Sequence, residues 1–341
     1  MTNVKKIALT TLIFLFTAAA VVIGFVIDFK RYADTPRDLG REELTVTIAA
    51  GDPFSKTISG LVAAGVVEHP RKFKLLARFT GDDKRLKAGE YGFSGRLSPR
   101  EVIAVLVEGA VKLYRLTIPE GYHLFQVAEA VQAAGFEKAD RFVELATSED
   151  RVREFKVGGK TLEGYLFPDT YFFPKGADAS MIITAMVHRF HEVFSQRWRA
   201  RAAELDLTIH EVVTLASIVE KETGAAHERE LISSVFHNRL KKGMRLEADP
   251  TVIYGLKTFD GNLTREHLKT PTPYNTYTNR GLPPGPIANP GKAALRAALF
   301  PADSDYLFFV ARRDGTHAFS TNLRDHQAAV RKYQLRRKKR E

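Results

Sequence analysis

The sequence contains no cysteine among its 341 residues. Disulfide bridges, thiolate metal sites and cysteine nucleophiles are therefore excluded. The chain also has no glycine-rich phosphate-binding loop, which argues against a pyridoxal-phosphate lyase, and no recognised nucleic-acid-binding motif. Hydrophobic residues make up 44% of the chain and charged residues 27%, values that are ordinary for a chain that folds.

Basic residues outnumber acidic ones, 51 to 40, which gives a formal net charge of +11. Such an excess raises affinity for any polyanion, whether nucleic acid, anionic lipid or cell-wall polymer. Part of it lies in a tail at residues 336–341, a composition typical of a solvated chain end. One alternative function that this charge suggests is a nucleic-acid binder facing the cytosol. That alternative predicts tight, salt-sensitive binding to DNA. Without a binding motif we expect no nucleic-acid partner.

No charged residue occurs between Ile7 and Ile27. As a helix this run would span about 31 Å, close to the thickness of the hydrocarbon core of a bilayer. A cleaved signal peptide is the alternative, because Ala18-Ala19-Ala20 is a plausible cleavage site. The apolar run continues well beyond those alanines, which favours an uncleaved transmembrane helix at residues 7–27 behind a cytoplasmic tail at residues 1–6.

The orientation of this helix does not follow from the flanking charges. More basic residues follow the run than precede it, but the positive-inside rule is weak for a long domain that follows the helix. Residues 28–42, which contain Pro36 and Gly40, are expected to be a linker.

A pattern in residues 44–66 returns in residues 116–136, seventy positions later. Six positions are identical between the copies: Thr47, Ile48, Gly51, Ala63, Ala64 and Gly65 match Thr117, Ile118, Gly121, Ala133, Ala134 and Gly135. Each copy reads as a short strand, a glycine break and an amphipathic helix closed by a C-terminal glycine, and a second helical pattern follows. The sequence therefore predicts two similar strand–helix–helix units.

Residues 208–223, TIHEVVTLASIVEKET, contain the clearest catalytic candidate. Thr208 and Glu211 form a capping box that starts a helix. Glu220 falls within the apolar stripe of that helix, where burial raises the pKa of a carboxyl toward the range useful to a general acid. The alternative is a structural carboxylate paired with an arginine, or a frayed helix end.

The stretch from Thr270 to Gly291 is too rich in proline, glycine, asparagine and tyrosine for regular structure. Loops of this kind often build binding clefts, although a scaffold role is the alternative. Four side chains would suit a sugar, because they combine flat apolar faces with amide and hydroxyl groups: Tyr274, Asn275, Tyr277 and Asn289.

Histidines give little support for catalysis or metal binding. Residues 306–310 and 317–320 read as a hairpin, in which we expect His317 to be a hydrogen-bonding core residue rather than a catalytic one. His188 and His191 lack a third ligand within reach, so we expect no metal.

Five stretches occur in an order that resembles one known family, the YceG-like, or MltG-type, endolytic murein transglycosylases. They are LTIPEGYHLFQVAEAV, LEGYLFPDTYFFPKG, ASIVEKET, RLEADPTVIYGL and YNTYTNRGLPPGPIANPG. The resemblance covers nearly all of the chain after the apolar run. It implies an α+β protein with an N-terminal transmembrane helix, a small LysM-like α+β subdomain at residues 43–113 and a larger α+β catalytic domain at residues 114–335.

The resemblance also implies site residues. Glu220 corresponds to the family's catalytic glutamate, and Glu163, Tyr165, Glu247 and Asp249 lie in motifs expected to bind substrate. Many relatives have glutamine where this chain has Glu247, so that residue is either a second site carboxylate or a hydrogen-bonding substitute. No cofactor is implied.

The implied reaction is endolytic cleavage of glycan strands between N-acetylmuramic acid and N-acetylglucosamine, with formation of a 1,6-anhydro end, and the implied role is termination of nascent strands. One carboxylate can serve this reaction, whereas a glycoside hydrolase usually needs two. The implied location is the bacterial inner (cytoplasmic) membrane, with the catalytic domain on the periplasmic side and peptidoglycan synthases as partners. The alternative is a non-catalytic, membrane-anchored cell-wall-binding scaffold.

Overall fold

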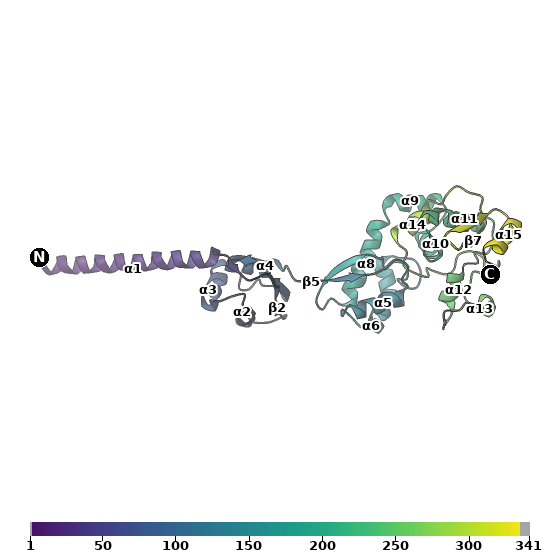
Figure 1. Cartoon of the computed structure of the whole chain (residues 1–341). Helices are drawn as coiled ribbons and strands as arrows, with labels where there is room; N and C mark the ends of the chain where they lie inside the picture. The colour runs from purple at the N-terminus through teal and green to yellow at the C-terminus, as the bar shows by residue number, and fades with distance from the viewer. Residues whose placement is uncertain (1, 335–341) are drawn as a thin grey trace, which may run out of the picture. The chain divides into compact units, whose positions relative to one another are not determined.

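A computed structural model describes residues 2–334 (Figure 1), and the predicted basic tail at residues 336–341 lies outside the described residues. The chain divides into two compact units, Met1–Tyr114 and Arg115–Glu341. Both contain helices and short strands, so the predicted α+β class is confirmed.

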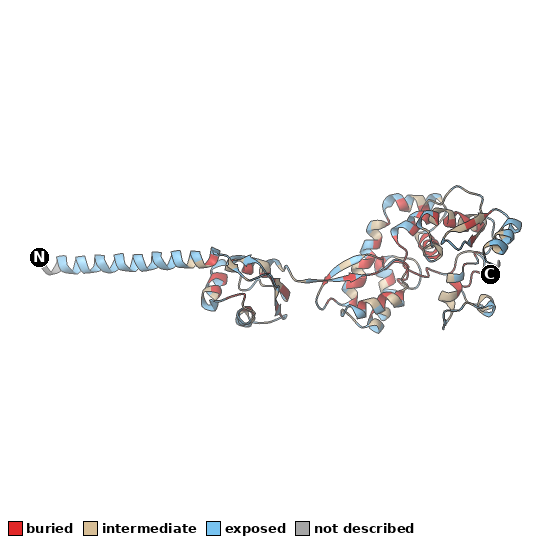
Figure 2. Cartoon of the chain, viewed as in Figure 1, coloured by how far each residue is buried: buried red, intermediate tan, exposed pale blue. Residues whose placement is uncertain are grey.

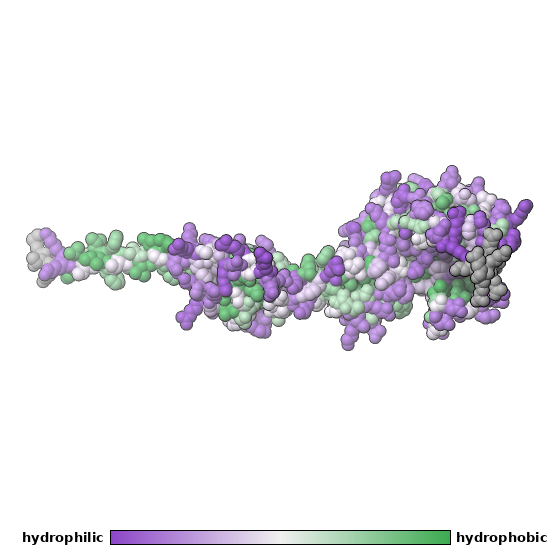
Figure 3. Space-filling view, viewed as in Figure 1, coloured by the Kyte–Doolittle hydropathy of each residue, from purple (hydrophilic) through white to green (hydrophobic). Residues whose placement is uncertain are grey.

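Helix α1 (Thr2–Asp34) contains the apolar run. Among the described residues it is the one helix long and apolar enough to cross a membrane, over Lys5–Asp34. Figures 2 and 3 show it exposed and hydrophobic along most of its length, and Phe14 and Phe16 are 72% and 76% exposed. A helix that is apolar all round and buries none of that surface in protein is suited to lipid, which fits a single-pass membrane anchor.

The rest of the first unit is a small module around a two-stranded antiparallel sheet, β2 (Leu44–Ile48) and β3 (Gly89–Phe93). Helices α2 (Phe54–Ala63) and α3 (Pro70–Thr80) connect these strands, and α4 (Pro99–Glu108) follows. Strands β1 (Arg37–Asp38) and β4 (Arg96–Leu97) form a second short pair. The core of the module includes Leu61, Phe73, Leu76, Tyr91, Phe93 and Leu106.

The predicted linker at residues 28–42 is helical over its first part, where α1 continues to Asp34. Ala33 is buried in the core of the module, and Asp34 Oδ1 accepts a hydrogen bond of 2.7 Å from Arg100 Nε. The linker prediction was wrong for residues 28–34 because no helix breaker occurs there before Pro36, and because the last turn of α1 finds an apolar partner.

The second copy of the repeat begins the larger unit. Strands β5 (Leu113–Thr117) and β6 (Thr170–Pro174) pair, and α5 (Leu124–Ala133) and α6 (Ala139–Ala146) lie between them in sequence, followed by α7 (Glu149–Phe155). Gly51 and Gly121 both have left-handed backbone, with φ of 82° and 77°. Equivalent glycines thus make equivalent turns, and the predicted repeat is confirmed.

The remaining elements pack around helix α10 (Ile209–Glu222), whose residues 212–219 are all buried. It packs against α11 (Arg229–Lys241) and α14 (Lys292–Leu299). The other helices are α8 (Ala179–Val193), α9 (Gln196–Glu204), α12 (Asp249–Gly255), α13 (Arg265–Lys269), α15 (Leu323–Tyr333) and the 3₁₀ turn η1 (Ala226–Glu228). Strands β7 (Phe308–Ala311) and β8 (His317–Ser320) form the predicted hairpin.

Candidate active site

Glu220 lies in the last turn of α10. The helix begins at the predicted capping box, in which Thr208 and Glu211 bond each other's backbone. Its apolar stripe carries Glu220 inward, and that side chain is 8% exposed. Oε2 of Glu220 accepts a hydrogen bond of 2.9 Å from the Gly291 amide, and Oε1 lies 3.8 Å from Nη2 of Arg229. The sequence thus predicted the burial of this carboxyl correctly.

Burial raises the pKa of Glu220, and the negative charge of Glu120 raises it further. The Gly291 amide, Arg229 and Lys221 act in the opposite direction. The net effect is upward, so Glu220 retains a proton at higher pH than a solvated glutamate does. Such a carboxyl can donate a proton to a leaving group and then take one back.

Glu120 is a second carboxylate at this site, and sequence reasoning missed it. It precedes Gly121 in the turn between β5 and α5, and its carboxylate lies against Gly291, where a Cβ would overlap it. Gly121 in turn lies against Glu220 Cγ, and Lys221 Nζ donates a hydrogen bond of 3.3 Å to its carbonyl. The second repeat copy contains this turn, but no spacing in the sequence relates it to Glu220.

Asn289 joins three segments behind Glu220. Its Oδ1 accepts hydrogen bonds from the amides of Gly164 and Leu166 at 2.9 and 3.0 Å. Its Nδ2 donates to the Tyr122 carbonyl at 2.9 Å and to Glu163 Oε1 at 3.2 Å. Asn289 was expected to contact a sugar, but it is fully buried and these bonds use its amide. It therefore holds the loop that presents the Gly291 amide to Glu220.

Three more of the expected substrate-binding residues are buried. Glu163 accepts hydrogen bonds from the Leu124 amide and the Tyr254 hydroxyl, and burial raises the pKa of Glu163 to about 7. Tyr165 bonds His210 Nδ1 at 2.9 Å, and Asn275 donates to two backbone carbonyls. A loop without regular structure leaves backbone groups that need partners, and asparagine amides provide them here.

Tyr274 is half-buried, and its ring centroid lies 4.8 Å from that of Tyr254. It lines a cavity of about 250 Å³ together with Glu163, His210 and Pro286. Of the four loop residues expected to bind a sugar, Tyr274 lines this cavity and Tyr277 lines a different one.

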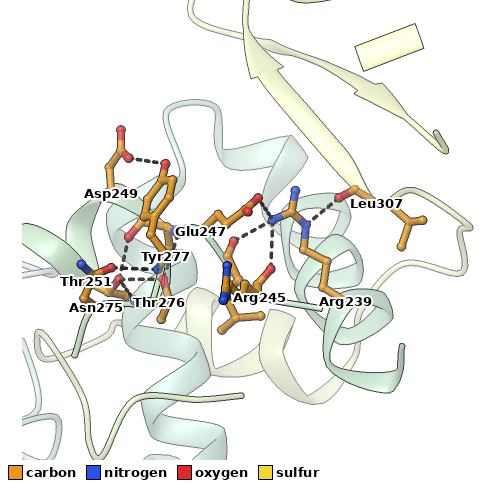
Figure 4. Close-up of polar contacts among 11 residues, drawn as sticks. Arg239, Arg245, Glu247, Asp249, Thr251, Asn275, Thr276, Tyr277 and Leu307 are labelled. Carbon is orange, nitrogen blue, oxygen red and sulfur yellow. Dashed lines mark hydrogen bonds and ion pairs between the residues drawn. The ribbon is translucent and has the colours of Figure 1, made fainter. Parts of the chain in front are cut away.

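Glu247, Asp249 and Tyr277 come together at the larger of these two cavities, which measures about 380 Å³. In Figure 4 the Asp249 carboxylate points at the Tyr277 hydroxyl, which donates a hydrogen bond of 2.7 Å to it. Arg239 Nη1 donates to Glu247 Oε2 at 3.1 Å. Glu247 has left-handed backbone, with φ of 49°, a conformation that costs energy for a residue other than glycine.

Glu222 also lines this cavity and was not among the expected site residues. Burial raises the pKa of Glu222 to about 7, and the charge of Asp249 adds to the effect. The sequence places Glu222 at the border of the apolar stripe of α10, and only the folded chain brings it beside Asp249.

His317 is a core hydrogen-bonding residue, as expected. Its Nδ1 lies 2.7 Å from Glu228 Oε2, and both side chains are about one-tenth exposed or less. Within residues 2–334, no group of three or more histidine, aspartate or glutamate side chains is placed to hold a metal ion.

Known proteins match most of the chain. The model of the YceG-like family matches residues 46–332. An endolytic murein transglycosylase of Bacillus subtilis (strain 168) is 32% identical over 307 residues, which cover 85% of this chain and 84% of that protein. Endolytic murein transglycosylases of two Streptococcus pneumoniae strains, D39 and R6, are each 30% identical over 96% of this chain, which spans 65% of their length.

A solved structure matches as well. The crystal structure of a YceG-like protein from Listeria monocytogenes has a TM-score of 0.59 and 34% sequence identity, and the match covers 84% of this chain and 98% of that one. The family match and the relative from Bacillus subtilis both extend over most of the sequence. The chain therefore belongs to the YceG-like family.

Proposed function

We propose that this protein is an endolytic murein transglycosylase and that Glu220 is its catalytic acid and base. The observation that carries the proposal is the buried Glu220 carboxyl, whose pKa is raised and whose Oε2 is fixed by the Gly291 amide. The names of the relatives from Bacillus subtilis and Streptococcus pneumoniae support the same activity.

In the proposed reaction the protonated Glu220 donates its proton to the oxygen that links N-acetylmuramic acid to the next N-acetylglucosamine. The bond from C1 of the muramic acid to that oxygen then breaks through an oxocarbenium-like state. The Glu220 carboxylate next takes the proton from the C6 hydroxyl of the same sugar, whose oxygen attacks C1. The ring closes as a 1,6-anhydro end, Glu220 regains its proton, and no water is consumed.

The placement of Glu120 suits this sequence of steps. Its negative charge favours the protonated form of Glu220 before cleavage. The same charge lies beside the position where positive charge develops on the sugar, which lowers the energy of the oxocarbenium-like state. Glu120 is thus an electrostatic partner of Glu220 in the proposed site.

We also propose domain roles and a location. The strand–helix–helix–strand order of β2, α2, α3 and β3 supports a LysM-like, glycan-binding role for residues 43–113, and residues 114–335 would form the catalytic domain. Helix α1 would anchor the protein in the inner membrane with both domains outside. Peptidoglycan synthases are the proposed protein partners, and repeated absence of glycan polymerases from pull-downs of the tagged protein would refute that part.

The test incubates the full-length protein in detergent with uncrosslinked glycan strands and reads the products by mass spectrometry. We expect anhydro-ended fragments, and we expect Glu220→Gln to lower the rate at least about a thousandfold, since the amide cannot donate and retrieve the proton. Reducing-end products would mean hydrolysis with a second carboxylate, for which Glu120, Glu247 and Asp249 are candidates. No cleavage by a folded protein would favour the wall-binding scaffold.

A further inference from the structure

The cavity of about 380 Å³ lies beside the C-terminal end of α10. Its walls come from α10, α11, the start of α12, the loop at Tyr277, the β7–β8 hairpin and α15. Glu222 contributes to it from α10, two residues after Glu220, and so faces a different side of the helix. The reaction proposed above uses none of the side chains that line it.

Acidic groups outnumber basic ones in the walls of this cavity. Three carboxylates line it, from Glu222, Glu247 and Asp249, against one guanidinium, from Arg239. Two histidines also line it. His317 is already paired with Glu228, and burial lowers the pKa of His326, which favours its neutral form.

The guanidinium of Arg239 is occupied by protein acceptors and is not available to bind a ligand. Its side chain is 9% exposed, and its Nε donates to the Leu307 carbonyl at 2.7 Å. Its Nη1 is held by two further carbonyls, those of Arg245 and Leu246, and by the Glu247 carboxylate (Figure 4). Arg239 therefore fixes the cavity wall and neutralises Glu247, and the charges of Glu222 and Asp249 remain unbalanced.

Two polar groups in this cavity have no protein partner. Within residues 2–334 the Glu222 carboxyl makes no hydrogen bond or ion pair, and the buried Nδ1 of His326 makes no hydrogen bond. Asp249, which is exposed, accepts one bond from Tyr277 at Oδ1, and its Oδ2 accepts none within residues 2–334. The Glu222 side chain is partly exposed at the cavity and has no protein donor there, so a cation that enters the cavity can reach its carboxyl.

We propose that this cavity is a subsite for a primary ammonium group carried by a peptide substituent of the glycan strand. An ammonium group has one positive charge and three donors, which match Glu222, Asp249 and the Tyr277 oxygen. A divalent metal fits less well, because no three ligands converge within residues 2–334. The proposal rests on the proposed function, since it takes murein as the substrate.

The chemistry of murein supplies such an amine. A peptide hangs from each N-acetylmuramic acid, and a diamino acid in it carries a free amine until cross-linking converts that amine into an amide. A side chain at the third peptide position lies up to about 10 Å from the sugar, and the cavity begins at Glu222, two residues after Glu220 on α10. Recognition of the ammonium group would select strands that have not yet been cross-linked.

The experiment compares two forms of one substrate. Uncrosslinked strands are divided, and one half is treated with acetic anhydride so that each free amine becomes an uncharged amide. The full-length protein in detergent is expected to cleave the untreated strands with about tenfold higher kcat/KM, the value of one buried charge-assisted contact. In Glu222→Gln the ratio of the two kcat/KM values should fall to about one, whatever its absolute activity.

The matched control is Glu266→Gln, which removes the same charge from α13, outside the cavity, and should keep the tenfold ratio. A ratio near one in the unaltered protein would overturn the subsite, and so would an unchanged ratio in Glu222→Gln. If neither strand is cleaved, the proposed function fails separately. Equilibrium binding of the two strands to Glu220→Gln then decides whether the ammonium group is recognised.

Discussion

At the scale of single residues, glutamate side chains have three different roles in this protein, according to the groups that surround each carboxyl. Glu220 and Glu222 share one helix turn, yet Glu220 has the Gly291 amide as a donor and Glu222 has no donor within residues 2–334. Glu163 is buried, and its carboxyl accepts hydrogen bonds from three protein donors. The hydrogen-bond partners thus distinguish Glu220 as the candidate catalyst, Glu222 as part of a candidate ligand site and Glu163 as a structural carboxyl.

The role of Glu120 gives a prediction about pH. Its charge raises the pKa of Glu220, so Glu120→Gln lowers that pKa. Because Glu220 must start the reaction protonated, the alkaline limb of the pH–rate profile should move to lower pH. Activity on the alkaline side should fall about two- to fivefold, as expected for a partly solvated charge pair.

The measurement is kcat/KM across pH 5 to 9 for the full-length protein. Glu144→Gln on α6 is the control, since it removes an exposed carboxylate that pairs with Arg141 away from Glu220, and its profile should not move. An alkaline limb that stays in place in Glu120→Gln would show that the two carboxylates do not interact in solution.

At the scale of elements, local patterns predicted the helices and the hairpin, and long-range contacts decided the site. The α10 capping box, the glycine turns of the repeat and the β7–β8 hairpin depend on residues a few positions apart, and all were predicted. Asn275 looked like a ligand group because its partners lie in or next to its own loop, where no regular pattern reveals them. Asn289 did so because its partners are distant in sequence. Glu120 and Glu222 were missed for the same reason, since their neighbours come from distant segments.

The loop that contains Asn289 offers a test of positioning against binding. Asn289→Ala removes four hydrogen bonds at a fully buried position and leaves several partners unsatisfied. The free energy of unfolding should fall by about 3–5 kcal/mol, with a loss of activity because the Gly291 amide is no longer held against Glu220.

Denaturant unfolding of the full-length protein in detergent measures this change, with Asn279→Ala, an exposed residue of the same loop, as the comparison. If Asn289→Ala kept its stability and lost only substrate affinity, Asn289 would contact the sugar after all.

At the scale of the whole molecule, the first unit joins the apolar helix to the small module without a break. Ala33→Asp would place a charge in the core of that module, where Ala33 is 1% exposed. We expect a destabilisation of several kcal/mol confined to the first unit. Limited proteolysis in detergent should then cut residues 35–113 early, while fragments of the second unit persist. Thr35→Asp adds the same charge at an exposed position and should resist.

Because α1 continues unbroken into the small module, it would also fix the distance between that module and the membrane. Seven residues, 28 to 34, carry the helix about 10 Å beyond its apolar run before the module core closes around Ala33. In the proposed arrangement, with α1 in the membrane and the module outside, the proposed glycan-binding module would therefore be held close to the lipid headgroups rather than on a flexible linker. The continuous helix would thus limit the proposed glycan-binding module to polymer that lies within reach of the membrane surface.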